Sequence, residues 1–238
     1  FEWIATSAFG LEGLVARELA RLGIEAKAEN GGARFFGSFE DAFRANLYAR
    51  CADRILLVMG RFEARSFEAL FEGVRALPWE DFIGEHTRFP VNGKCARSQL
   101  MSVRDCQAIT KKAIVERLRG RYRTDWFVED AETVSIDVAL HGDVAQLTLD
   151  ASGTALNRRG YRTWNGEAPL RETLAAALVT LSRYRGRDPF CDPFCGSGTI
   201  PIEAALIAKN RAPGLDRRFD SQRWAFLPAE AWMNAADE

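Results

Sequence analysis

A glycine-rich octapeptide, Asp192–Thr199, constrains the fold of this chain more than any other stretch of its sequence. The short apolar run before it, Phe190–Cys191, is predicted to be a brief strand, and Thr199–Lys209 after it a helix. A strand, a tight turn and a helix in this order open a doubly wound α/β fold. Because Gly196 and Gly198 lack a Cβ atom, the backbone there can approach a ligand closely.

Several kinds of glycine-rich site are excluded by the residues around this turn. A P-loop needs a lysine after its last glycine, but Thr199 follows Gly198, and a dinucleotide fingerprint needs a glycine where Pro201 stands. Asp192, four positions before the first glycine, instead suits a cationic ligand with amine and ribose groups. Ser197 or Thr199 is expected to cap the helix. The alternative is a tight strand–helix turn that binds no ligand.

The N-terminal part of the chain predicts a separate small fold. Asn30 and Gly31 lie between two short extended runs, which indicates a hairpin, and Ser38 is placed to cap a helix. The predicted order is β-α-β-β-α-β, a ferredoxin-like unit of about 60 residues. Its elements are expected at 3–6, 10–22, 25–29, 33–36, 39–50 and 54–62.

A second α/β unit and the start of a third segment follow. The second is expected to contain a helix at 67–77 capped by Ser66, a strand at 87–91 with a turn at 92–93, a helix at 104–119, and a hairpin at 134–140 and 144–149. The third begins with a helix at 170–183 and continues into the glycine-rich turn. Because 29 residues follow Lys209, we expect the third domain to be incomplete in this chain.

Charge is segregated along a chain whose net charge is −1. Residues 94–123 contain nine basic and two acidic residues, 124–150 seven acidic and no Lys or Arg, and 151–187 seven Arg and two Glu. Local basic blocks can recruit nucleic acid by neutralising phosphates, although charge runs are more often solvated helix faces. The predicted loop 92–98 adds backbone N–H groups and a hydroxyl before a helix, which favours anion binding.

The remaining composition excludes other classes. No apolar stretch approaches 18 residues and the first residues do not resemble a signal peptide, so neither a membrane span nor a secretion signal is expected. The five cysteines form no C-x2-C pair, which argues against a structural zinc site, and we expect no metal. An odd number of scattered cysteines is typical of a reduced, cytoplasmic protein.

The string D-P-F-C-G-S-G-T resembles motif I of class I S-adenosylmethionine-dependent methyltransferases, in the form found in the THUMP-domain RNA methyltransferases. Members of this family are often labelled N6-adenine-specific DNA methylases, and the best-known bacterial ones methylate guanine N2 in 23S rRNA. Further stretches resemble the family's linker L-x-R-R-G-Y-R, the helix before motif I and the THUMP segment; they are residues 155–162, 168–175, 98–100 and 106–109 with 111–114.

The resemblance implies three domains: a ferredoxin-like domain (1–64), a THUMP RNA-binding domain (65–153), and a linker with the first part of a Rossmann-like methyltransferase domain (154–238). It implies that S-adenosylmethionine is held by Asp192, Pro193, Phe194, Cys195, Gly196, Gly198, Leu170 and Thr173, with Asp192 near the methionine amine. The expected RNA contacts, each of which could equally be a solvated surface group, are Lys94, Arg97, Ser98, Lys111, Lys112, Arg158, Arg159 and Arg162.

The sequence departs from the family pattern at two points. Asn157 stands where the family often has histidine, and motif IV, an Asn/Asp-Pro-Pro-Tyr/Phe tetrapeptide, is not found. Motif IV would hold the target amine of the flipped base, so no catalytic residue is assigned and these 238 residues alone are predicted to be inactive.

The function implied is methylation of guanine N2 in 23S rRNA. The alternatives are a tRNA guanine-N2 methyltransferase, a non-catalytic THUMP RNA-binding module, and a DNA adenine-N6 methyltransferase.

Overall fold

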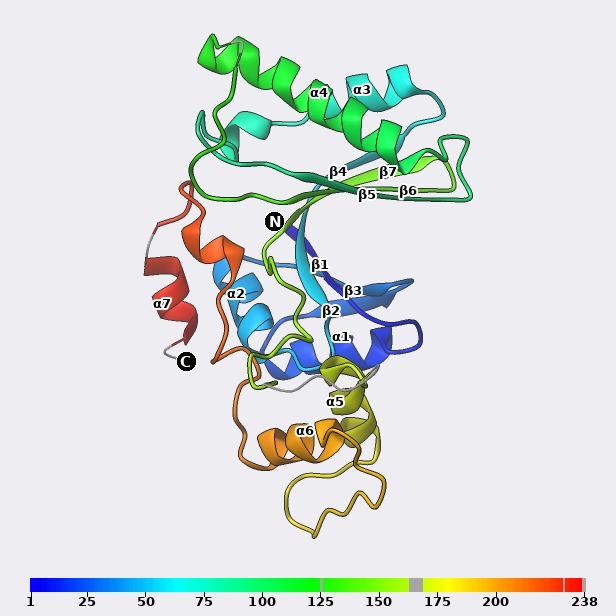
Figure 1. Ribbon diagram of the computed structural model, residues 1–238, viewed down its shortest axis with the longest axis vertical. Coiled ribbons are helices and arrows are strands. Elements are labelled where there is room, and N and C mark those ends of the chain that lie inside the picture. Colours follow the sequence, from blue (N-terminus) through cyan, green and yellow to red (C-terminus); the bar gives the residue numbers. More distant parts are fainter. Residues whose placement is uncertain (125, 163–168, 229, 237–238) are drawn as a thin grey trace. The chain divides into compact units, whose positions relative to one another are not determined.

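The computed structural model describes residues 1–124, 126–162, 169–228 and 230–236 (Figure 1). The chain divides into two compact units. Unit 1 contains Phe1–Ile55, Thr154–Phe219 and Glu230–Glu238, and unit 2 contains Leu56–Gly153 and Asp220–Ala229. Within the described ranges, no helix is long and apolar enough to cross a membrane.

Unit 1 begins with the predicted β-α-β-β-α-β order, which the structure confirms. Its strands pair in the order β2-β3-β1-β4, and β3 is antiparallel to both β1 and β2. Trp3, Phe35 and Phe43 are buried in its core. The elements are β1 (Glu2–Thr6), α1 (Glu12–Arg21), β2 (Ala26–Glu29), β3 (Gly32–Phe36), α2 (Phe39–Tyr48) and β4 (Arg54–Glu63), the last of which continues in unit 2.

The predicted serine caps are present at two helix starts. The Oγ atom of Ser38 accepts a hydrogen bond from the backbone N–H of Asp41, whose carboxylate in turn accepts from the Ser38 backbone N–H. This capping box satisfies two backbone donors at the start of α2. Ser66 caps α3 (Phe67–Arg75) by a single bond, in which its Oγ atom accepts from the backbone N–H of Ala69.

The third segment of the chain adds helices to unit 1. Helices α5 (Glu172–Leu181) and α6 (Thr199–Ala208) pack against each other, and α7 (Glu230–Ala236) packs against α2. The Trp232 ring of α7 stacks on Phe43 and on Phe219, with ring centroids 4.3 and 4.9 Å apart respectively. The predicted strand at Phe190–Cys191 is wrong, because these residues have no regular secondary structure.

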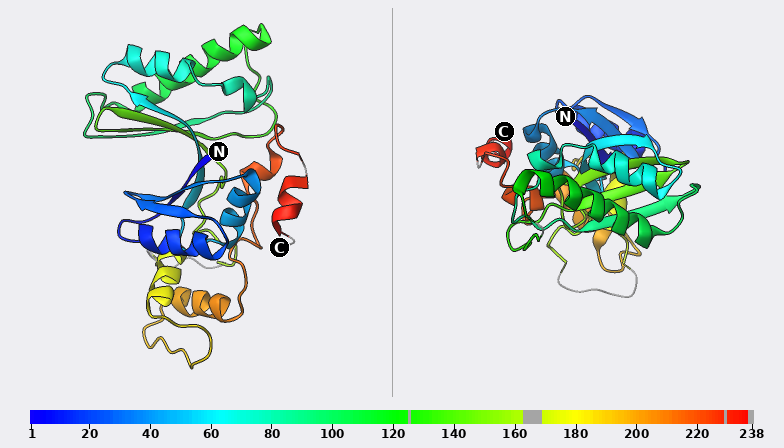
Figure 2. Two further views of the ribbon diagram at one scale, coloured as in Figure 1. Left: turned by 180° about the vertical axis from the view of Figure 1, so that it is seen from behind. Right: turned by 90° about the horizontal axis from the view of Figure 1, so that it is seen from above.

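Unit 2 is a sheet covered on one face by helices. Its strand order is β4-β7-β6-β5, and Figures 1 and 2 show α3 and α4 together on one face of this sheet. The predicted hairpin is confirmed as β6 and β7. The further elements are the 3-10 turn η1 (Trp79–Asp81), β5 (Val91–Ala96), α4 (Val103–Tyr122), β6 (Ile136–His141), β7 (Val144–Asp150) and the 3-10 turn η2 (Asp220–Arg223).

The predictions for residues 87–98 are wrong in register. The strand is β5 rather than 87–91, and it runs parallel to β6, so residues 92–96 are not part of a loop. A Cβ atom on Gly93 would lie 3.0 Å from the Gln107 side chain and 3.2 Å from Val103 on α4. The glycine there thus favours the close approach of α4 to the sheet, and it does not form a turn.

Candidate cofactor site and nucleic-acid interface

The glycine-rich turn leads directly into the N-terminus of α6. Gly196 and Gly198 have φ angles of +54° and +75°, in the left-handed region that favours glycine. Gly198 is itself the N-cap residue, and no side chain caps α6, so the prediction that Ser197 or Thr199 does so is wrong. A side-chain cap requires an extended N-cap backbone. The hydroxyls of Ser197 and Thr199 instead lie 3.1 Å from each other.

The face of the turn is open. The Asp192 Oδ1 atom accepts a hydrogen bond of 3.1 Å from the backbone N–H of Phe194, which closes a local turn. The Phe194 side chain is 93% exposed, and Pro193 and Cys195 are exposed as well. A Cβ atom on Gly196 would meet nothing within 4 Å. The geometry thus leaves space for a ligand beside the backbone of this turn.

Helix α5 carries the other two predicted cofactor residues. Leu170, just before the helix, is partly exposed at 36%, and its carbonyl accepts a hydrogen bond from Arg162. Thr173 is buried, and its hydroxyl donates to Asp53 Oδ1 at 2.9 Å. Thr173 therefore anchors α5 to the segment before β4, a contact that the sequence analysis did not predict.

Arg162 connects three segments of unit 1. Its Nε atom donates to Glu172 Oε1 at 2.8 Å, and its terminal nitrogens donate to Thr199 Oγ1 at 3.0 Å and Ser197 Oγ at 3.4 Å. Its side chain is only 16% exposed. Asn157, where the family often has histidine, donates to Glu172 Oε2 at 3.5 Å. The linker is thereby tied both to the start of α5 and to the glycine-rich turn.

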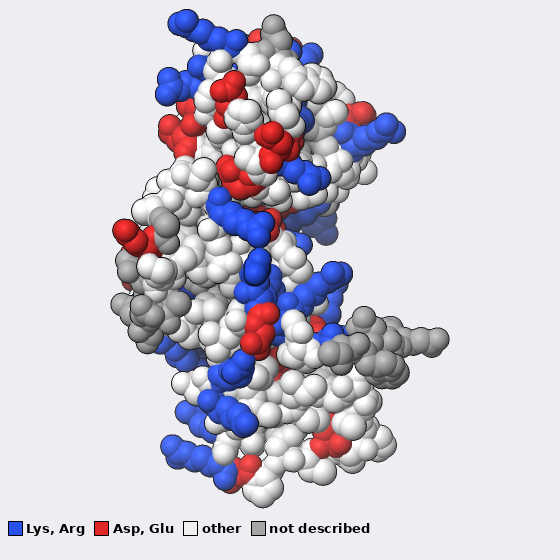
Figure 3. Space-filling view, turned by 60° about the vertical axis from the view of Figure 1, so that its left-hand side comes forward, with Lys and Arg blue, Asp and Glu red and all other residues white. Residues whose placement is uncertain are grey.

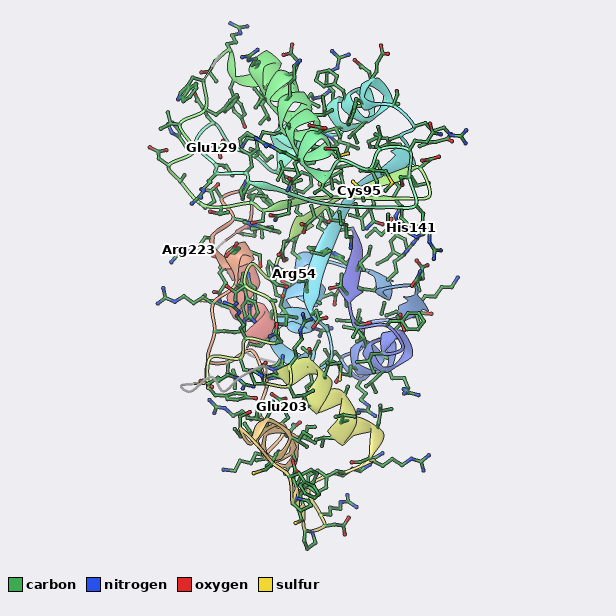
Figure 4. All side chains as sticks on the ribbon, turned by 45° about the vertical axis from the view of Figure 1, so that its right-hand side comes forward. Arg54, Cys95, Glu129, His141, Glu203 and Arg223 are labelled. Atoms are coloured by element: carbon green, nitrogen blue, oxygen red, sulfur yellow. The ribbon has the colours of Figure 1, made fainter. Side chains whose placement is uncertain are left out.

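Arg159 lies in a buried ionic cluster with Glu203 of α6, which Figure 4 labels. The Arg159 Nε and Glu203 Oε1 atoms are 3.4 Å apart, and Arg159 is 3% exposed and Glu203 0%. The Arg159 guanidinium also donates to the carbonyls of Leu156 and Arg50, and the Tyr161 hydroxyl lies 3.1 Å from Glu203 Oε1. Burial raises the pKa of Glu203, while Arg159 opposes this rise.

A half-buried carboxyl, that of Glu18, joins α1 to the residues after α2. Glu18 Oε2 accepts from the backbone N–H groups of Cys51 and Arg50, at 3.0 and 3.3 Å, and the Cys51 thiol lies 3.3 Å from Glu18 Oε1. Burial raises the pKa of Glu18 and, together with the nearby Glu18 carboxyl, that of the Cys51 thiol. Cys51 is therefore an inert core thiol.

The predicted RNA contacts of unit 2 separate into exposed and engaged side chains. Lys94, Arg97 and Lys112 are exposed. Lys111 Nζ is paired with Glu129 at 2.6 Å, donates to the Phe89 carbonyl at 2.9 Å, and lies 3.3 Å from the Phe89 ring centroid. Figure 3 shows basic and acidic side chains interspersed on the face in view, as expected for a nearly neutral chain.

Three RNA contacts expected from the sequence do not agree with the structure. Ser98 is buried, and its hydroxyl donates to the Ala96 carbonyl and accepts from the Asp143 backbone N–H. Arg159 and Arg162 are engaged in the clusters described above. We therefore remove these three from the proposed RNA contacts. Arg158, next to Arg159, is exposed and stays in the proposal.

The acidic partners of the two linker arginines were not predicted from the sequence. Glu172 and Glu203 are the single charged residues of the observed helices α5 and α6, whose other residues are apolar or small. An isolated charge in such a helix signals a buried partner. In the described part of the chain, no group of three or more His, Cys, Asp or Glu residues could hold a metal ion.

Three family models match the chain in succession. They are the RlmL ferredoxin-like domain at residues 2–56, the THUMP domain at 64–150, and the RMKL-like methyltransferase domain at 159–237. The curated relative "Putative RNA methyltransferase YpsC" of Bacillus subtilis is 48% identical over 98% of this chain and 61% of its own length. "Ribosomal RNA large subunit methyltransferase K/L" of Magnetococcus marinus is 36% identical over 100% of this chain and 34% of its own length.

A solved structure agrees over the whole chain. The solved structure described as "SMU.472, a putative methyltransferase complexed with SAH" superposes with a TM-score of 0.94 at 40% identity, and the match covers 100% of this chain and 63% of that chain. The three domain types define a class of RNA-modifying proteins. The chain belongs to the THUMP-domain class I S-adenosylmethionine-dependent RNA methyltransferase family. It spans about a third to two thirds of the length of these relatives.

Proposed function

We propose that the full-length protein is an S-adenosylmethionine-dependent RNA methyltransferase that acts in the cytoplasm. The observation that carries this proposal is the open turn Asp192–Thr199, with two left-handed glycines at the N-terminus of α6. It is supported by the SAH-bound neighbour and by the THUMP match at residues 64–150.

The proposed domain boundaries are those expected from the sequence, 1–64, 65–153 and 154–238. The compact units divide the chain differently, since 154–219 groups with 1–55.

The residues of the turn fit the cofactor that this family uses. When bound, the cofactor would supply a sulfonium methyl group: the substrate amine nitrogen would bond to the methyl carbon as the S–C bond breaks, with SAH as the leaving group. Asp192 would hold the methionine amine by a charge-assisted hydrogen bond, and the backbone at Gly196 and Gly198 would lie along the cofactor. Phe194 would cover it, and Leu170 would line the methionine end; Thr173, which is buried with its hydroxyl bonded to Asp53, is removed from the proposed cofactor contacts. These groups position the reactants, which is the main contribution a protein can make to direct displacement.

The finer proposal is that the target is guanine N2 of 23S rRNA. It is supported by the relatives named as large-subunit ribosomal RNA methyltransferases. A tRNA guanine, a DNA adenine, or RNA binding without catalysis are the alternatives to be tested.

Methyl transfer to total RNA tests the proposal. The full-length protein is incubated with methyl-labelled S-adenosylmethionine and unmodified total RNA, and rRNA and tRNA are then separated and digested to nucleosides. Label in N2-methylguanosine of 23S rRNA is expected. Label in tRNA would keep the chemistry and change the substrate, and label in DNA adenine alone would contradict RNA methylation. Binding of RNA without any transfer would identify a binding module.

Two exposed basic side chains of unit 2 should contribute to RNA affinity through phosphate contacts. We expect Lys94→Ala and Arg97→Ala each to weaken RNA binding and to reduce the slope of log K against log salt by about 1. Lys111→Ala should change the slope less, because Glu129 already pairs with its ammonium group. Filter binding or fluorescence anisotropy at 50–300 mM salt, about the range in which such slopes are resolved, measures this. Unchanged slopes for both variants would show that Lys94 and Arg97 do not contact RNA phosphates.

A further inference from the structure

We infer that Arg162 is a positioning residue, which acts through the glycine-rich turn to hold it in its cofactor-binding conformation. The inference rests on the proposed function. Arg162 lies in the linker, 30 positions before Asp192, and its charge alone made it an expected RNA contact. In the structure its guanidinium is directed instead at the two hydroxyls on either side of Gly198.

The contacts of Arg162 reach both the turn and the start of α5. One terminal nitrogen donates to Thr199 Oγ1 at 3.0 Å and to the Leu170 carbonyl at 3.3 Å, and the other donates to Ser197 Oγ. Nε pairs with Glu172, which is 5% exposed. A planar guanidinium can make these contacts at once in a fixed fork, and a lysine ammonium cannot. Arg162 thus links the turn to the helix whose start bears the predicted methionine-end residues.

The turn needs such a support because its own contacts are few. No side chain caps α6, and the residues before the turn form no strand. Within the described residues, the backbone bonds that hold it are Gly198 N–H to the Cys195 carbonyl, at 2.8 Å, and Ile202 N–H to the Gly198 carbonyl, at 3.0 Å, beside the Phe194 N–H bond to Asp192.

Glu172 makes the position of the cation favourable. The N-terminus of a helix carries partial positive charge, so a guanidinium at the start of α6 is repelled unless an anion accompanies it. Glu172 supplies that anion, and its own place in the first turn of α5 is favourable for a carboxylate. Asn157 donates to the second oxygen of the same carboxylate and holds it toward Arg162.

Two measurements on the full-length protein test the inference. Amide hydrogen exchange without cofactor reports on the turn itself, and we expect Arg162→Ala to speed exchange about tenfold at residues 196–200 and 202, since Pro201 has no amide hydrogen. Calorimetric titration with SAH is expected to show about tenfold weaker binding. Arg162→Lys should recover only part of both effects. Arg187→Ala, which removes an exposed arginine before the turn, is the matched control and should change neither.

The mechanism is separated from general destabilisation by a double-mutant cycle. Thr199→Val removes the nearer hydroxyl, and if Arg162 acts through it, the effects of Arg162→Ala and Thr199→Val on SAH affinity will be less than additive. Additive effects, or wild-type exchange at 196–200 and 202 in Arg162→Ala, would overturn the inference. If the wild-type protein binds no SAH, the proposed cofactor fails, and the exchange measurement still decides whether Arg162 holds the turn. If Arg162→Ala does not fold, Arg162→Lys and Thr199→Val provide the same comparisons.

Discussion

Replacement of Arg159 by alanine is expected to lower the free energy of unfolding of unit 1 by about 3–5 kcal/mol, the usual cost of breaking a buried ion pair. The variant leaves the fully buried Glu203 carboxyl without its cation. The carboxyl must then either stay charged in the interior or take up a proton, and both states are costly. Urea denaturation followed by intrinsic fluorescence measures the change.

Arg158→Ala is the matched control, because Arg158 is exposed and adjacent in sequence. Its effect on the free energy of unfolding should lie within about 0.5 kcal/mol of zero, as for most surface substitutions.

The loss of free energy of unfolding in Arg159→Ala, called the deficit below, should also depend on pH. Because removal of Arg159 takes away an interaction that lowers the pKa of Glu203, the folded-state pKa rises further above its ordinary value of 4.5. A raised folded-state pKa favours folding at low pH, so the deficit should grow as the pH rises above 4.5. A deficit equal to that of Arg158→Ala would contradict the ion-pair role.

The second large effect is expected at the cofactor turn. Asp192→Asn should weaken binding of S-adenosylmethionine by about 10–150-fold, because a hydrogen bond to a charged group contributes about 1.5–3 kcal/mol. Asparagine keeps the side-chain oxygen that accepts from the Phe194 backbone N–H, so the local turn is retained and the charge alone is lost. Calorimetric titration of the full-length protein with the cofactor is the measurement.

Asp188→Asn provides the comparison for Asp192→Asn. Asp188 is exposed and lies four residues earlier, so the same change of charge is made outside the turn. We expect the Asp188→Asn variant to bind the cofactor within about twofold of the wild-type affinity. That change is well under the tenfold loss that corresponds to about 1.4 kcal/mol, the smallest loss expected for Asp192→Asn. Equal losses in the two variants would indicate a general electrostatic effect and would exclude a specific contact at Asp192.

Local features of the sequence predicted local structure well. Ser38 and Ser66 cap the helices that follow them, because the capping contact lies within three residues. The β-α-β-β-α-β order followed from the periodicity of apolar residues. The predicted strand at Phe190–Cys191 did not form, since a strand also needs a hydrogen-bonded neighbour, and no strand pairs with these two residues in the part of the chain that the structure describes.

Long-range contacts were the main source of error. The partner of Arg159 is Glu203, 44 residues later, and the hydroxyls held by Arg162 are 35 and 37 residues away. Nothing in a run of arginines distinguishes one that binds phosphate from one that is buried. Gly93 was assigned to a turn because the sequence does not show that α4 lies close to it. That close approach is a tertiary contact, which the absence of a Cβ atom at Gly93 favours. The glycines of the octapeptide were recognised because their conformation is set within the motif.

The discontinuous composition of unit 1 has a consequence for synthesis on the ribosome. Leu56 and Asp150 are paired neighbours on β4 and β7, so the chain enters and leaves the sheet of unit 2 at adjacent points. Residues 1–55 must wait for about 100 further residues before Thr154–Phe219 emerges. At about 5–20 residues per second this interval is roughly 5–20 s. During that time the nascent N-terminal segment lacks the later groups that bond to it, Arg159 at the Arg50 carbonyl and Thr173 at the Asp53 carboxylate.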